Sequence, residues 1–210
     1  MTVALLPGLR GDPAEFCPLL ALLPSARLLG LPASLDDTLA AIAARLPDAD
    51  LIDVDVIIGA SFGGLVARAL VASGRTRATL VLVATLPHPL APPEARRCAV
   101  LGRLVPLLPS PVYRALYGRR AAQEWAEDAD SPWSGEGLPT ADVLGARLRA
   151  IAAWGLPPIP TGTVCVWGER DRFATWTEAD VRGWGGVPAV LAGGHRPHLS
   201  HPDRLLDLLG

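Results

Sequence analysis

Short apolar runs alternate with helical patterns along most of this 210-residue chain. A strand that is apolar on both faces and leads into a helix is typical of a parallel sheet covered on both sides. We therefore expect an α/β fold with a doubly wound, parallel sheet of six strands. The expected strands are residues 3–8, 27–31, 55–59, 78–85, 163–168 and 188–194, and the expected helices are 34–46 (with Ser34 as its N-cap), 63–73, 177–184 and 201–210.

The segment between the fourth and fifth expected strands has a different composition. Residues 86–160 are rich in Pro, Arg and Trp, and their patterns predict short helices near 94–105, 111–128 and 140–154, with no strand. We expect residues 1–85 and 161–210 to form the core. Residues 86–160 are then a helical cap inserted over the carboxyl edge of the sheet, and we call them the cap segment.

A serine between glycines stands where the third expected strand gives way to a helix. Residues 59–63 read Gly-Ala-Ser-Phe-Gly and fit the pattern G-x-S-x-G. In that pattern a sharp turn exposes the serine hydroxyl, and the glycines let strand and helix backbones approach closely. A small serine in a glycine-rich turn is the alternative interpretation. The preceding strand and following helix favour Ser61 as a nucleophile.

A nucleophilic serine needs a base, and the chain has four histidines: His88, His195, His198 and His201. His195 follows Gly-Gly at the end of the last expected strand, where a loop can turn back over the carboxyl edge of the sheet. We therefore expect His195 to be the base. His198 is the competing base, with loop packing or pocket lining as its other interpretations, and His201 is interpreted as the start of the last helix.

The base in turn needs an orienting acid, and two acids follow the fifth expected strand. Asp171 is the expected partner, because this loop can reach the imidazole and fix its tautomer. Glu169 is the competing acid. Two backbone N–H groups are expected to hold the oxyanion: that of Phe62, next to the nucleophile, and that of Leu9, in the loop after the first strand.

Four motifs together resemble the α/β-hydrolase superfamily. They are PGLRG after the first strand, GASFGG after the third, WGERD after the fifth and GGHRPHLSHP after the sixth. The chain departs from the family in two ways: Pro7-Gly8 stands where His-Gly is usual, and the family's first two strands are missing. The loop, the SFGGLVAR segment and the cap are most similar to bacterial carboxylesterases, nearest to the pimeloyl-carrier-protein methyl ester esterases of biotin synthesis.

The resemblance implies an ester substrate held between cap and sheet edge. We expect Leu86, His88, Tyr113, Trp125 and His198 to contact the substrate, and Phe62, Leu9, Leu107 and Trp133 to add apolar surface to an acyl pocket. Residues 95–122 contain six arginines and no acid, which would steer an acidic acyl carrier protein. A solvated, amphipathic cap is the alternative. These candidate docking residues are Arg96, Arg97, Arg103, Arg114, Arg119 and Arg120.

The charge and composition of the chain argue against several other classes of function. The net charge of −2 argues against a nucleic-acid partner, and no run approaches the roughly 18 apolar residues of a membrane span. Three scattered cysteines, without a C-x-x-C motif, indicate neither a zinc site nor a disulfide framework and suit the cytoplasm. The predicted triad needs no metal or organic cofactor.

Two other functions fit the same motifs. The first is a lyase or C–C hydrolase resembling the menaquinone-pathway synthase, in which the triad abstracts a proton. The second is a non-catalytic binding module on the same fold, suggested by Pro7 and the shortened sheet.

Overall fold

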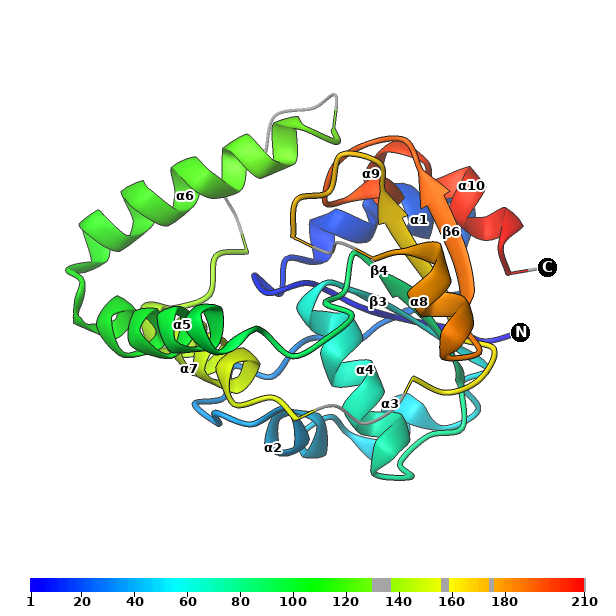
Figure 1. Cartoon of the computed structure of the whole chain (residues 1–210), viewed down its shortest axis with the longest axis horizontal. Helices are drawn as coiled ribbons and strands as arrows, with labels where there is room; N and C mark the ends of the chain where they lie inside the picture. Colours follow the sequence, from blue (N-terminus) through cyan, green and yellow to red (C-terminus); the bar gives the residue numbers. More distant parts are fainter. Residues whose placement is uncertain (130–136, 156–158, 174–175, 210) are drawn as a thin grey trace.

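The computed structural model describes residues 1–129, 137–155, 159–173 and 176–209. The expected fold class is confirmed: six strands form one parallel sheet in the order β2-β1-β3-β4-β5-β6 (Figure 1). The strands are β1 (Val3–Leu6), β2 (Arg27–Leu28), β3 (Val56–Ala60), β4 (Thr79–Val83), β5 (Val164–Gly168) and β6 (Val187–Leu191).

Helices cover both faces of this sheet (Figure 1). One group, in which α1 contacts both α9 and α10, lies on one face, and α4 with its neighbour α2 lies on the other. The helices outside the cap segment are η1 (a 3-10 helix, Pro13–Phe16), α1 (Cys17–Leu22), α2 (Leu39–Ala44), α3 (Asp48–Leu51), α4 (Phe62–Ala72), α8 (Glu178–Gly183), α9 (Pro197–Ser200) and α10 (Pro202–Asp207).

The apolar character of the central strands explains why helices cover both faces of the sheet. Every residue of β1 and of β3 is buried, so neither face of these central strands is left to water. The first turns of α4 lie against the backbone of the loop after β1, because Gly63 has no Cβ to keep them apart. The start of α4 is thereby fixed beside that loop.

The prediction of one long helix over 34–46 is wrong. The helix α2 begins at Leu39, after Thr38, whose hydroxyl accepts a 3.2 Å hydrogen bond from the N–H of Ala41. Ser34 is therefore not the N-cap. Upstream, the carbonyl oxygen of Pro32 accepts a 3.3 Å hydrogen bond from Arg147 of the cap segment, so a distant tertiary contact holds this part of the chain.

The cap segment carries α5 (Pro92–Leu104), η2 (a 3-10 helix, Val105–Leu107), α6 (Ser110–Ala126) and α7 (Ala141–Ala152), close to the predicted ranges. It leaves the sheet at the carboxyl end of β4 and returns to β5 (Figure 1). Helices α5 and α7 cross closely at Gly102 and Gly145, where a Cβ on either glycine would lie within 2.7 Å of the other's carbonyl oxygen. None of the helices in the described part of the chain has both the length and the apolar character needed to cross a membrane.

Candidate active site

Ser61 occupies a strained turn between β3 and α4. Its backbone has φ 49° and ψ −113°, a conformation that residues with a side chain rarely adopt. Its N–H donates a 2.7 Å hydrogen bond to the carbonyl oxygen of Val83, and its own carbonyl accepts one of 3.1 Å from Gly64. Such strain persists only where the surroundings impose it, which is typical of functional sites.

Three glycines make this turn possible. A Cβ on Gly59 would lie 2.6 Å from the Cα of Gly64, and one on Gly64 would lie 2.0 Å from the hydroxyl oxygen of Thr85. A Cβ on Gly63 would lie 2.2 Å from the carbonyl oxygen of Leu6. The glycines therefore permit the close strand–helix approach that the sequence pattern predicts.

The structure brings Ser61, His195 and Asp171 into one hydrogen-bonded chain. The His195 Nε2 lies 3.1 Å from the Ser61 Oγ, and the His195 Nδ1 lies 3.1 and 3.0 Å from the two carboxylate oxygens of Asp171. The Asp171 side chain is completely buried, and that of His195 is 13 % exposed. A carboxylate facing Nδ1 fixes the tautomer in which Nε2 accepts the serine proton.

The competing acid Glu169 and the competing base His198 lie outside this hydrogen-bonded chain. Glu169 is exposed, and its backbone N–H continues the pairing toward β6 by donating to Leu191. His198 lies inside the protein, 1 % exposed, with its ring 5.1 Å from that of Phe16. The candidate base and acid are therefore His195 and Asp171.

Two backbone N–H groups predicted to hold the oxyanion, those of Phe62 and Leu9, belong to the start of α4 and to the loop after β1. Phe62 is the first residue of α4, so its N–H has no acceptor within the helix. Leu9 lies in the neighbouring loop after β1. In the described ranges, neither N–H donates to an acceptor in the protein. These are the two donors expected for an oxyanion, supported by the positive end of the dipole of α4.

A cavity of about 310 Å³ opens beside His195. The ring of Phe173 meets that of His195 edge to face at 5.2 Å, and Arg120 lies 5.6 Å above the Phe173 ring. Most of its described lining residues carry polar side chains; they are Arg120, Gln123, Glu124, Glu127, Arg172, Phe173 and His195.

None of the five predicted substrate contacts lies among the described residues of that lining. The structure corrects the prediction that His198 contacts the substrate. Its ring is enclosed in the core rather than lining a cavity, and burial lowers its pKa to about 3. Tyr113 and Trp125 are also buried, on the inner face of α6, where the Tyr113 hydroxyl donates a 2.7 Å hydrogen bond to the carbonyl oxygen of Pro139. His88 is exposed and lies edge to face with Trp184 at 4.8 Å.

The other residues predicted to contact the substrate or to line an acyl pocket differ in how far they are buried. Leu86 is half-buried against the core, and its carbonyl oxygen accepts a 3.4 Å hydrogen bond from Arg68. Phe62 is a core residue that is 1 % exposed, whereas Leu107 is 75 % exposed. Trp133 lies outside the described residues.

Buried charged residues that the sequence analysis did not single out surround the site. Glu15 accepts a hydrogen bond from the N–H of Gly8, next to Leu9, and burial raises the pKa of its carboxyl. Arg147 reaches the same loop from α7, and burial lowers its pKa to about 10. Asp128, after α6, binds the backbone around His195. No local pattern marks these residues, because their contacts span between 7 and 138 positions.

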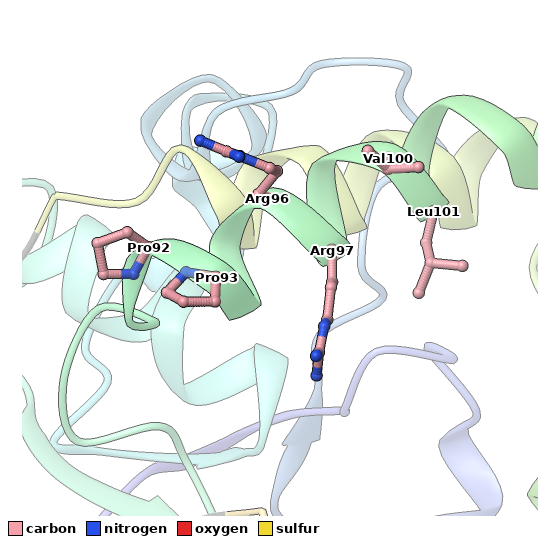
Figure 2. A pocket seen from close by; sticks show the side chains of 6 residues that line it. All are labelled: Pro92, Pro93, Arg96, Arg97, Val100 and Leu101. Atoms are coloured by element: carbon pink, nitrogen blue, oxygen red, sulfur yellow. The ribbon is translucent and has the colours of Figure 1, made fainter.

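The six cap arginines are all exposed. A second cavity of about 640 Å³ lies along α5 and is lined by Pro92, Pro93, Arg96, Arg97, Val100 and Leu101. Figure 2 shows Arg97 and Leu101 projecting from one side of α5, with Arg96 on the other. Arg120 differs from the other five, because it lines the cavity at His195 and forms a 2.9 Å ion pair with Glu124.

The described part of the chain holds no group of three or more His, Cys, Asp or Glu side chains arranged to bind a metal ion.

A six-stranded parallel sheet with a serine on the turn after β3 defines an α/β-hydrolase architecture. Residues 3–208 match the model of the alpha/beta hydrolase family, and the chain belongs to this family. No curated protein matches the chain by sequence.

Solved structures with the same fold include enzymes of several activities. A thermophilic esterase from Thermogutta terrifontis is 18 % identical with a TM-score of 0.74, and the alignment covers 100 % of this chain and 88 % of that one. The enol-lactonase from Burkholderia xenovorans LB400 is 20 % identical with a TM-score of 0.68, covering 99 % and 90 %. The RedJ thioesterase of the prodiginine pathway in Streptomyces coelicolor is 22 % identical with a TM-score of 0.60, covering 99 % and 83 %. At these identities the likeness concerns the fold alone.

Proposed function

We propose that this protein is a serine hydrolase that cleaves carboxylic esters through an acyl-enzyme. The observation that supports this function most directly is the hydrogen-bonded chain from Ser61 through His195 to the buried Asp171. The strained backbone of Ser61 adds to it, because such strain is typical of an activated nucleophile on this turn.

The chemistry follows from the positions of these groups. His195 Nε2 takes the proton of the Ser61 hydroxyl as the serine oxygen bonds to the ester carbonyl carbon, and the N–H groups of Leu9 and Phe62 stabilise the oxyanion. The tetrahedral intermediate collapses, and His195 gives its proton to the departing alkoxide. Water then attacks the acyl-enzyme with His195 again as base, which releases the acid and restores Ser61.

We further propose that the substrate is an acyl ester on a carrier protein, such as a pimeloyl-carrier methyl ester of biotin synthesis. The arginines of α5 and α6 support this, since an acidic carrier would meet a positive surface. Exposed apolar side chains on the same helices add contact area for an acyl chain or partner. They are Val100, Leu101, Leu104, Val112 and Leu116. The three free cysteines support a cytoplasmic location.

The decisive experiment is intact-mass analysis after treatment with a fluorophosphonate probe. We expect one adduct on the wild type and none on Ser61→Ala. His195→Ala should label at least about a hundredfold more slowly, because the serine loses its base. The rate of p-nitrophenyl ester hydrolysis should follow the same order, with the wild type fastest, His195→Ala much slower and Ser61→Ala inactive.

The other functions give different results. An adduct without ester turnover, together with release of pyruvate or an alkene from a suitable substrate, would identify a lyase. No adduct and no turnover, with a ligand that raises Tm, would identify a binding module.

The carrier proposal has its own test. For a carrier-bound acyl ester, kcat/KM should fall as salt rises, and Arg96→Glu/Arg97→Glu should lower it while leaving a free p-nitrophenyl ester unaffected. Equal losses on both substrates would contradict a docking role.

A further inference from the structure

A carboxylate of the cap segment holds the backbone on both sides of His195. Asp128 follows α6 and is 6 % exposed. Its Oδ1 accepts a 2.5 Å hydrogen bond from the N–H of Gly194, and its Oδ2 accepts one of 2.8 Å from the N–H of Arg196. The two donors are the residues immediately before and after His195, so one side chain fixes both peptide groups that flank the candidate base.

The glycine pair before His195 fits this carboxylate. Gly193 has φ +117°, and a Cβ built on it would lie 2.7 Å from the Oδ1 of Asp128. A Cβ on Gly194 would lie 3.0 Å from its Oδ2. Side chains at these positions would displace Asp128. The Gly-Gly that precedes His195 in the sequence therefore makes room for a group from the cap segment.

A second carboxylate of the cap segment, Glu124 of α6, holds the same loop through a side chain. Glu124 lies 3.3 Å from an Nη2 of Arg196, and Arg196 also lies 3.8 Å from Glu15, which accepts from the N–H of Gly8. Because the Arg196 side chain is only 8 % exposed, these ion pairs are shielded from solvent. The backbone of the His195 loop is thus held by Asp128, just after α6, and the Arg196 side chain ties the loop to Glu124 of α6 and to Glu15.

We propose that Asp128 is a positioning residue for the reaction, which holds the His195 loop so that the imidazole lies between Ser61 and Asp171. This inference rests on the proposed function. A cap residue thereby completes the alignment of a base that belongs to the core. Two buried N–H groups would lose their acceptor without it, and the loop would rearrange to satisfy them.

The matched variants are Asp128→Asn and Asp142→Asn. The first keeps the shape but places an NH₂ group against one of the two N–H donors. The second removes an exposed carboxylate from the first turn of α7, also in the cap segment. With a p-nitrophenyl ester, we expect Asp128→Asn to lower kcat and the fluorophosphonate labelling rate by about 10- to 100-fold, while KM changes less than about twofold. Asp142→Asn should match the wild type.

A double-mutant comparison separates positioning from general damage. If Asp128 acts through His195, adding Asp128→Asn to His195→Ala should leave the small residual rate unchanged, because the base is already lost. An equal fractional loss in both backgrounds would overturn the proposal. So would a wild-type rate in Asp128→Asn.

Hydrogen–deuterium exchange tests the contact without activity. The peptide over residues 193–201 should exchange faster in Asp128→Asn than in the wild type or Asp142→Asn, with the rest of the core unchanged. If the wild type forms no fluorophosphonate adduct, the proposed function fails. The exchange result then still decides whether Asp128 holds this loop, and unchanged exchange would overturn that claim.

Discussion

Arg147, on the cap helix α7, donates a 2.6 Å hydrogen bond from its Nη1 to the carbonyl oxygen of Leu9. Its guanidinium also lies 5.9 Å from the centre of the Phe62 ring. Leu9 and Phe62 are the two residues whose N–H groups are proposed to hold the oxyanion. One buried arginine of the cap segment therefore contacts both sides of the proposed oxyanion hole.

Replacing Arg147 by methionine should affect both stability and rate. The Leu9 carbonyl would lose a charged donor, and a hydrogen bond of that kind contributes about 2 kcal/mol. The Leu9 peptide would also be less well oriented, so kcat should fall by about tenfold. Urea unfolding and ester hydrolysis measure the two effects. Arg204→Met, at an exposed position of α10, is the control. Equal behaviour of the two variants would show that Arg147 does not position this loop.

The strain at Ser61 leads to a second prediction. Glycine adopts positive φ without a steric penalty, so Ser61→Gly should raise the free energy of unfolding by about 1 kcal/mol while abolishing activity. Ser61→Ala is the control, because it also lacks the hydroxyl but keeps the Cβ. Urea denaturation of both variants makes the comparison. A glycine variant no more stable than the alanine variant would mean that the backbone of Ser61 carries little strain.

The core of the site could be predicted because each candidate residue lies just beyond the end of a strand. In a parallel sheet these ends meet at one edge, so Ser61, Asp171 and His195 converge even though 134 positions separate the first from the last. Short apolar runs were enough to predict the strands, and the glycines around Ser61 marked the turn.

The contacts of the cap segment could not be predicted in this way. Asp128 and Arg147 touch the core at Gly194 and Leu9, and no spacing in the sequence records which helix face meets which loop. The prediction that His198 contacts the substrate failed for a related reason. A histidine so near the candidate base in the sequence suggests a polar site, whereas the structure packs its ring on Phe16. The start of α2 was also mispredicted, because Thr38 rather than Ser34 caps this helix.

The glycine that brings α4 against the loop after β1 should tolerate no side chain. In Gly63→Ala the new Cβ would lie 2.2 Å from the carbonyl oxygen of Leu6, so α4 or the loop has to move. We expect the free energy of unfolding to fall by about 3 kcal/mol. Gly183→Ala, in α8, is the control because it meets nothing within 4 Å and should be neutral or slightly stabilising. Similar Tm values for the two variants would contradict the tight strand–helix approach.

His198 should make the fold sensitive to acid. Burial, with Arg196 and His195 nearby, lowers its pKa in the folded protein to about 3, against a value near 6.5 when exposed. Between these values the unfolded chain binds a proton that the folded chain does not, so stability is lost as pH falls below about 6.5. The slope is about 1.4 kcal/mol per pH unit, or about 2 kcal/mol between pH 6.5 and 5.

A His198→Leu variant removes this linkage. Other groups titrate alike in both proteins, so the difference in unfolding free energy between variant and wild type should grow by about 2 kcal/mol from pH 7 to pH 5. At pH 7 the variant should already be about 1 kcal/mol more stable, because neither ring nitrogen of His198 has a hydrogen-bond partner within the described residues. Urea denaturation at each pH measures the difference. In the wild type, the NMR signal of the His198 ring should stay constant from pH 7 to 4; a midpoint near 6.5 would show that the imidazole is hydrated rather than enclosed beside Phe16.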